Sequence, residues 1–205
     1  GPGAFIRALK NKIRLDRLDI LFVSHAHLDH YNDAEIIIEA MTRGGNTKRG
    51  YLVVGKDVIE DKCISTYHLS LLAGYFSLNA GEKINAEGID ISATKIVHGD
   101  KEDGVGFKVS YANETLGYTS DTVYYDGLEN YFYSCDVLIL NVLRPEGKKL
   151  PHHMDSKEAE KIIELTRPRI AILNHFGMLM IKEGIDKIAN KISKITGVKT
   201  IAAKD

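Results

Sequence analysis

Residues 25–30 read His25-Ala26-His27-Leu28-Asp29-His30, so three imidazoles and one carboxylate fall within six positions. Imidazole and carboxylate are ligands that a borderline metal such as zinc accepts. Alternate residues of an extended segment share a side, which places His25 and His27 to bind one ion. Asp29 and His30, past the bend, are placed to turn toward a second. Three clustered imidazoles are hard to explain as packing, and the stretch therefore predicts a metal-binding segment.

The flanks of this stretch indicate where it lies in the fold. An apolar run at 18–23 precedes it and predicts a buried strand. Asn32, with Glu35 three residues later, predicts the N-terminus of a helix after it. We therefore expect the ligands on a loop that is held at both ends by regular structure, which suits a binding site.

One loop cannot complete two metal sites, so further ligands are expected from other strand ends. His98, Asp121 and His175 each follow an apolar run, at 96–97, 116–120 and 170–174. Alone, each would more often be structural: a satisfied histidine, or an aspartate in a turn. Beside the 25–30 cluster they become candidate metal ligands. His68 has no second ligand near it in the sequence and is interpreted as structural.

Strand-like and helix-like runs alternate along the chain and predict a layered α/β sandwich in a single domain, 1–205. Helices are predicted at 185–195 and after Asp155, where Glu158 three residues later completes a capping box. Strands are predicted at 19–24, 51–54, 89–94, 106–110, 116–119, 137–141, 170–173 and 198–202.

The composition excludes several classes of protein. A net charge of −1 argues against a globally basic nucleic-acid binder. No apolar run approaches the ~20 residues that cross a bilayer, so no membrane association is expected and a cytoplasmic location is predicted. Cys63 and Cys135 form no metal-binding or disulfide pattern and are expected to be reduced thiols.

The order of the candidate ligands resembles the metallo-β-lactamase superfamily, whose signature is HxHxDH followed by a distant His, an Asp and a final His. The resemblance covers nearly the whole chain and implies an α/β (α+β) fold, a four-layer αββα sandwich with the metals at one edge. The superfamily's usual first N-terminal strands are not found in this sequence. By resemblance, one ion is bound by His25, His27 and His98, a second by Asp29, His30 and His175, and Asp121 bridges the two.

The segment Leu150-Pro151-His152-His153-Met154-Asp155 is similar to the phosphodiesterase-like branch of the superfamily. That branch includes the tRNA 3′-processing nucleases, the PhnP-type phosphodiesterases and uncharacterised archaeal hydrolases. In it a non-ligand histidine precedes the last helix before the final ligand, and His153 matches that position better than His152. Other branches carry a cysteine in place of Asp121 or a glutamate in place of His27, and this chain carries neither.

The resemblance implies a hydrolase with two divalent ions, zinc or alternatively manganese or iron, in which a metal-bound hydroxide attacks a phosphodiester-type substrate. Asp29 would both ligate a metal and steer the hydroxide, and His153 would protonate the leaving group. The alternative for His153 is a role in capping the helix at Asp155. A thioester or lactone substrate, and a non-catalytic metal-binding module of the same fold, are the alternatives for function.

The expected partner is a small phosphoester or another small ester. The glycine-rich, basic segment 42–50 leaves two interpretations open, a contact for phosphate or nucleic acid and a surface loop, of which the loop is favoured. No long substrate-binding arm is evident, so nucleic acid is not favoured. A homodimer remains an open alternative.

Overall fold

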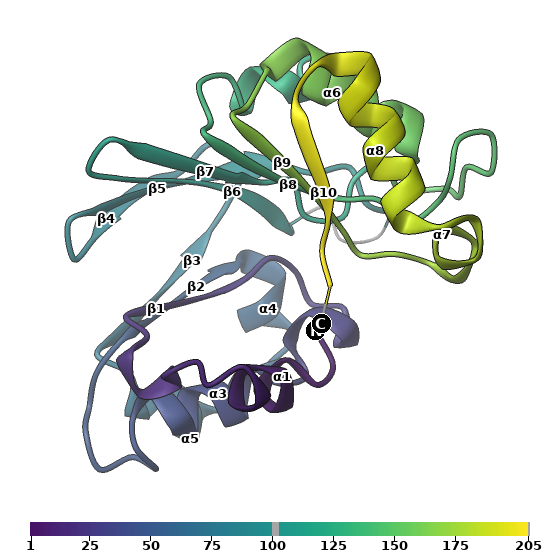
Figure 1. The fold of residues 1–205 in the computed structure, drawn as a ribbon. Coiled ribbons are helices and arrows are strands. Elements are labelled where there is room, and N and C mark those ends of the chain that lie inside the picture. Colours follow the sequence, from purple (N-terminus) through teal and green to yellow (C-terminus); the bar gives the residue numbers. More distant parts are fainter. Residues whose placement is uncertain (100–102, 205) are drawn as a thin grey trace. The chain divides into compact units, whose positions relative to one another are not determined.

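The computed structural model describes residues 1–99 and 103–204. The chain forms two compact units, each with its own sheet (Figure 1). Unit 1 comprises residues 1–79 and 103–105. Unit 2 comprises 80–102 and 106–205, of which 80–99 and 106–204 are described. The prediction of a single domain stays a prediction.

Unit 1 is built on a parallel sheet in the order β1-β2-β3. Its central strand is apolar on both faces, and Leu52, Val53 and Val54 are fully buried, as the continuous apolar run predicts. Helices α3 and α5 contact each other and pack on β1 and β3, respectively. The elements are α1 (Ala4–Lys10), η1 (Leu15–Arg17), β1 (Ile20–Val23), α2 (Leu28–Tyr31), α3 (Ala34–Met41), β2 (Tyr51–Gly55), α4 (Lys56–Glu60), α5 (Thr66–Leu71) and β3 (Gly74–Leu78).

Unit 2 contains a mixed seven-stranded sheet in the order β10-β9-β8-β7-β6-β5-β4. Strands β7 to β10 run parallel, so their carboxyl ends meet at one edge, whereas β4 with β5 and β6 with β7 are antiparallel. The elements are β4 (Lys83–Ala86), β5 (Ile89–Lys95), β6 (Val105–Tyr111), β7 (Glu114–Tyr118), η2 (Leu128–Tyr131), β8 (Val137–Asn141), α6 (Ser156–Thr166), β9 (Ile170–Asn174), α7 (Met178–Glu183), α8 (Ile185–Thr196) and β10 (Lys199–Ala202).

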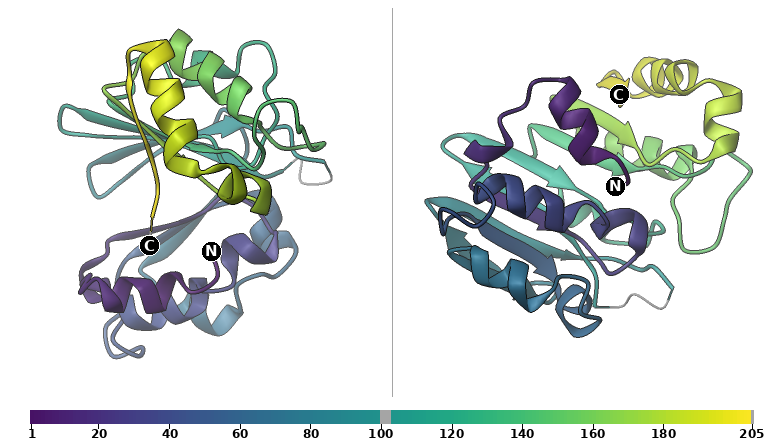
Figure 2. Two further views of the ribbon diagram at one scale, coloured as in Figure 1. Left: turned by 45° about the vertical axis from the view of Figure 1, so that its right-hand side comes forward. Right: turned by 90° about the horizontal axis from the view of Figure 1, so that it is seen from below.

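Helices α6 and α8 lie side by side over the sheet of unit 2 (Figure 2). Their apolar residues, such as Ile162 and Ile192, join Leu138 and Leu140 of β8 in one core cluster. The predicted capping box at the start of α6 is confirmed: the Asp155 carboxylate accepts from the Lys157 and Glu158 amides, and Glu158 accepts in return.

The prediction that Asn32 caps the N-terminus of a helix is wrong. Asn32 is instead the C-terminal cap of the one-turn helix α2, and Asp33 is the N-cap of α3. The Asp33 side chain makes no capping bond, because its carboxylate accepts the amide N–H of Phe5, at 2.9 Å. Strands β3 and β4 were not predicted, since their short alternating sequences carry weak apolar signals.

Both cysteines are free of disulfide bonds, as predicted. Cys135 is buried, and this burial raises the pKa of its thiol, which therefore stays protonated at neutral pH. Among the residues that the structure describes, no helix combines the length and the apolar composition needed to cross a bilayer.

Candidate metal centre

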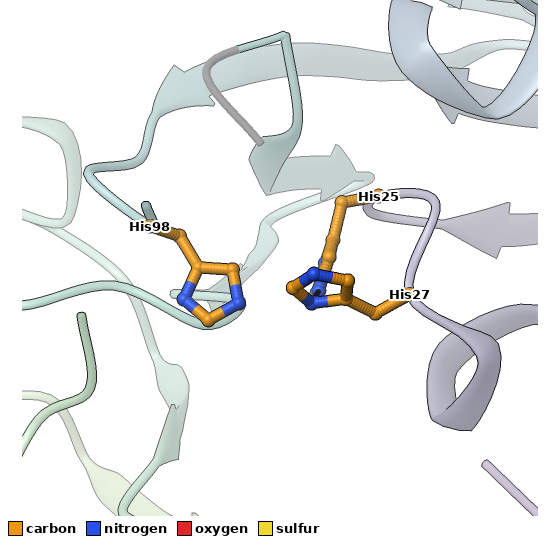
Figure 3. Close-up of side chains that lie close together, drawn as sticks. All are labelled: His25, His27 and His98. Atoms are coloured by element: carbon orange, nitrogen blue, oxygen red, sulfur yellow. Dashed lines mark hydrogen bonds between the residues drawn. The ribbon is translucent and has the colours of Figure 1, made fainter. Parts of the chain in front are cut away.

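In unit 1, His25 and His27 lie on the loop that directly follows β1 (Figure 3). The His25 ring is fully buried, with Ser24 Oγ 3.1 Å from its Nδ1. Its other nitrogen, Nε2, lies 3.1 Å from Nδ1 of His27. Two ligands held at 2.0–2.1 Å around a tetrahedral zinc ion stand roughly 3.3 Å apart, so these two nitrogens fit a shared ion.

Asp29 and His30 lie on the one-turn helix α2, where a loop was predicted. The His30 ring is 4.1 Å from the His25 ring, centroid to centroid, and its Nε2 is 3.6 Å from Asp29 Oδ2. The His30 side chain is 8% exposed, whereas that of Asp29 is 54% exposed. The first three imidazoles of the motif are therefore packed together, and its carboxylate reaches solvent.

Two residues at the start of α4 support this loop. Asp57 is buried, and its Oδ2 accepts the backbone N–H of Ala26, the residue between His25 and His27, at 2.9 Å. A Cβ on Gly55 would lie 2.5 Å from the Ser24 carbonyl oxygen. Only glycine therefore lets the end of β2 approach the ligand loop this closely.

In unit 2, Asp121 lies at the centre of a histidine cluster. Its carboxylate is 2% exposed, and Oδ2 lies 3.3 Å from His175 Nε2, 3.6 Å from His153 Nδ1 and 3.9 Å from His98 Nε2. The ligand atoms of His98, Asp121 and His153 lie close enough to hold one metal ion. One buried carboxylate oxygen thus faces three imidazole nitrogens. A divalent cation bound among them would compensate the buried negative charge of Asp121.

The parallel strands of unit 2 explain how these distant residues meet. Asp121 follows β7 and His175 follows β9, two strands whose carboxyl ends lie at the same edge of the sheet. The turns that present them pass through left-handed backbone at Ser120 (φ 59°) and at His175 itself (φ 60°). Such a conformation costs about 1–3 kcal/mol per non-glycine residue and is concentrated at functional sites.

His98 is oriented by the backbone of the neighbouring 150–155 segment. Its Nδ1 donates to the carbonyl oxygen of His152, at 2.7 Å. A carbonyl only accepts, so Nδ1 carries the proton of this bond and Nε2 is the nitrogen that faces Asp121. Of the two adjacent histidines, His152 therefore contributes its carbonyl and His153 its ring.

The second oxygen of Asp121 is held separately. Asn141, the last residue of β8, donates from Nδ2 to Asp121 Oδ1 at 2.7 Å. The carboxylate thus has one oxygen fixed by a neutral amide and the other facing the imidazoles.

Comparison with known families identifies the family to which the chain belongs. Residues 2–176 match the β-lactamase superfamily domain. The chain belongs to this family. The predicted resemblance to the metallo-β-lactamase superfamily is therefore confirmed, and the two sheets with their helices are those of its fold.

This β-lactamase superfamily chain matches part of the length of its curated relatives. It is 36% identical to the uncharacterized protein MJ1374 of Methanocaldococcus jannaschii, over all of this chain and 78% of the relative. It is 28% identical to the UPF0173 metal-dependent hydrolase TV0864 of Thermoplasma volcanium, over 77% of this chain and 66% of the relative.

Solved structures share the superfamily fold at low identity. The metallo-β-lactamase fold protein YhfI of Bacillus subtilis matches with a TM-score of 0.82 and 19% identity, over 98% of this chain and 81% of that one. Zinc-bound PqqB of Methylobacterium extorquens matches with a TM-score of 0.76 and 10% identity, over 100% and 79%. A diphosphatase of the PhnP family matches with a TM-score of 0.71 and 18% identity, over 100% and 75%.

Within each unit, the structure brings together the candidate ligands that the sequence predicts for that unit. The joint assignment of His25, His27, Asp29, His30, His98, Asp121 and His175 to two ions stays a prediction. Sequence reasoning missed Asp57 and Asn141. Asn141 carried a readable signal, a polar residue that closes the apolar run Val137-Leu138-Ile139-Leu140, whereas nothing in the sequence marks Asp57.

The interpretation of His68 needs one correction, because it does have acidic neighbours. Glu35 Oε1 lies 3.1 Å from its Nδ1 and Glu39 Oε1 lies 3.4 Å from its Nε2. The two carboxylates face opposite sides of the ring and so do not converge on one ion. His68 links α3 to α5, which is consistent with the predicted structural role.

Proposed function

We propose that this protein is a dinuclear metal-dependent hydrolase that acts on phosphodiester-type substrates. The observation that carries the proposal is the buried Asp121 carboxylate, whose Oδ2 lies within 3.3–3.9 Å of three imidazole nitrogens. The description of a curated relative as a metal-dependent hydrolase supports it. So does the zinc bound by the structural neighbour PqqB.

The residues present fit such ions in their chemistry. Imidazole and carboxylate donors suit zinc best and also accept manganese or iron. In the order of the superfamily motif, the first ion would be held by His25, His27 and His98, the second by Asp29, His30 and His175, and Asp121 would serve both. Bound there, two divalent ions would supply Lewis acidity and lower the pKa of water.

Two side chains would handle protons. Asp29, whose carboxylate is largely exposed, would orient the attacking water and accept its proton. His153 would donate a proton to the leaving oxygen from its ring, since an imidazole can act as a general acid. Its side chain is 19% exposed, so the ring can exchange protons with solvent after each turnover.

The phosphodiester assignment draws on His153 and on the similarity of 150–155 to the phosphodiesterase-like branch. A structural neighbour described as a diphosphatase of the PhnP family agrees with it. A thioester or lactone would use the same ions, and a thiolate leaving group has less need of a proton donor. The choice between these substrate classes therefore depends on whether His153 takes part in turnover.

Metal analysis followed by a substrate screen tests the proposal. The purified full chain, loaded in turn with zinc, manganese or iron, should bind about two ions, one per predicted ligand set. The loaded protein should hydrolyse bis(p-nitrophenyl) phosphate faster than a thioester or a lactone, and lose this activity on chelation.

Each part of the proposal can fail separately. A chain that binds no metal after loading would contradict the dinuclear site. Two ions with thioester or lactone hydrolysis alone would overturn the substrate class, and two ions without any hydrolysis would favour a non-catalytic module.

A further inference from the structure

We propose that Asn141 is a positioning residue that fixes the Asp121 carboxylate, so that Oδ2 is presented to the metal ions. The inference rests on the proposed function, because it assumes that Asp121 is a metal ligand. It assigns to β8, which contributes none of the predicted ligands, a part in building the site.

The amide of Asn141 has both of its N–H groups committed. Asn141 is 3% exposed, and Nδ2 donates to Asp121 Oδ1 at 2.7 Å and to the Tyr118 hydroxyl at 3.0 Å. Two acceptors on different residues fix the rotation of the amide about its last side-chain bond. The N–H groups, rather than the carbonyl, must therefore face the carboxylate.

The backbone of Asn141 belongs to the same network. Its N–H donates to Thr119 Oγ1, at 3.1 Å, and this hydroxyl donates in turn to the carbonyl oxygen of Ser120, at 3.0 Å. Ser120 is the left-handed residue of the turn that presents Asp121. Side chain and backbone of one residue thus hold both the carboxylate and its turn.

The choice of asparagine follows from the charges in the cluster. A carboxylate at position 141 would repel Asp121, and an ammonium group would neutralise the charge that the ions require. A neutral amide holds Oδ1 and leaves the negative charge of Asp121 available. No described protein group donates to Asn141 Oδ1. This buried oxygen is therefore left unsatisfied in the orientation that lets Nδ2 donate to Asp121 and Tyr118.

The geometry also explains how all three imidazoles can face a single oxygen of Asp121. The three distances of 3.3, 3.6 and 3.9 Å all end on Oδ2. Without the Asn141 bond, the carboxylate would rotate and divide its two oxygens among these neighbours. Loss of such an outer partner typically weakens metal binding by about 10–100-fold.

The test compares two Asn141 variants with a matched control. Asn141→Leu keeps the side-chain volume without the donor, and Asn141→Ala removes the amide altogether. Asn174 offers the control, because it pairs with Asn141 in the register of β8 with β9 but has an exposed side chain. Thermal melts of the metal-free proteins check that each variant folds.

Metal affinity is measured by chelator competition with zinc, and ligand geometry by the visible spectrum of the cobalt-loaded protein. Both Asn141 variants should bind zinc about 10–100-fold more weakly and show an altered cobalt spectrum, whereas Asn174→Ala should match the wild type in both. A purely structural role would change the melts and leave the cobalt spectrum unchanged.

The outcomes separate this inference from the proposed function. Wild-type affinity and an unaltered cobalt spectrum in Asn141→Leu would overturn the role of Asn141 and leave the dinuclear hydrolase standing. A wild-type chain that binds neither zinc nor cobalt would overturn both. Weakened binding in Asn174→Ala to the same degree would also overturn the inference, since the effect would then belong to the whole strand end.

Discussion

In unit 1 the candidate ligands come from one six-residue stretch after β1, whereas in unit 2 they come from three separate segments of the chain, which carry His98, Asp121 and His175. The stretch 25–30 carries its imidazoles in sequence order and is supported by the bond from Ala26 to Asp57. The unit 2 cluster depends on three strand ends, two left-handed turns and the amide of Asn141. The same donor types are thus supplied once by local sequence and once by tertiary structure.

The two regions also differ in where they bury negative charge. Asp29 has a side chain that is 54% exposed, whereas that of Asp121 is 2% exposed. A buried carboxylate is costly unless cations or hydrogen bonds compensate it. We therefore expect the unit 2 set to depend more strongly on bound metal, and single substitutions there to have the larger effects.

The largest effect is expected for Asp121→Ala. It removes the oxygen that three imidazoles share, so metal content and hydrolysis should both fall, activity by more than about 100-fold, beyond the effect of losing an outer partner. Asp29→Ala removes an exposed carboxylate and should lower activity while one ion is retained. Metal content per chain and the rate with bis(p-nitrophenyl) phosphate measure both effects. A fully loaded Asp121→Ala protein would refute a bridging role.

The next effect concerns His153. His153→Ala should leave metal content unchanged and slow hydrolysis of a phosphodiester with a poor leaving group by about 100-fold or more. With p-nitrophenolate, which leaves without protonation, the loss should be smaller. The ratio of the two rates is therefore the measurement. His68→Ala, which removes a histidine outside the cluster, serves as the control. Equal losses on both substrates would remove His153 from proton transfer.

The comparison explains how much the sequence could predict. The HxHxDH stretch is contiguous, so its donors could be recognised without knowledge of the fold. His98, Asp121 and His175 were recognised because each ends an apolar run, and parallel strands bring such ends together. Eight strands and the capped helix α6 were also predicted close to their observed bounds, since buried strands have long apolar runs.

The supporting residues could not be predicted for a physical reason. Asp57 acts through the backbone N–H of Ala26, and His152 through its own carbonyl, so neither interaction depends on a recognisable pair of side chains. Asn32 was misassigned because the capping pattern does not record that one-turn helix α2 intervenes. Backbone contacts and short elements are set by tertiary packing, which a single sequence does not display.

A smaller effect is expected for Asp57→Ala, which tests the support of the unit 1 loop. A hydrogen bond to a buried charged group contributes about 1.5–3 kcal/mol, and the free energy of unfolding should fall by that amount. Urea denaturation measures it. Glu60→Ala is the matched control, because Glu60 lies on the same helix α4 with an exposed side chain that pairs with Lys56. Equal destabilisation by both variants would show that the Ala26 bond is unimportant.

The smallest effect is expected at the cap of α6. Asp155→Ala removes the acceptor of two helix amides and should lower the free energy of unfolding by about 1 kcal/mol, while Asp155→Asn, which caps equally well, should stay close to the wild type. Asp155 ends the segment that carries His153. Metal content therefore distinguishes a role of Asp155 in stability alone from an additional role in building the unit 2 cluster. If Asp155→Ala loses only stability, His153 is held by the other contacts of the segment, such as that from the Leu143 amide to the Met154 carbonyl. If it also loses metal, the cap belongs to the construction of the unit 2 cluster.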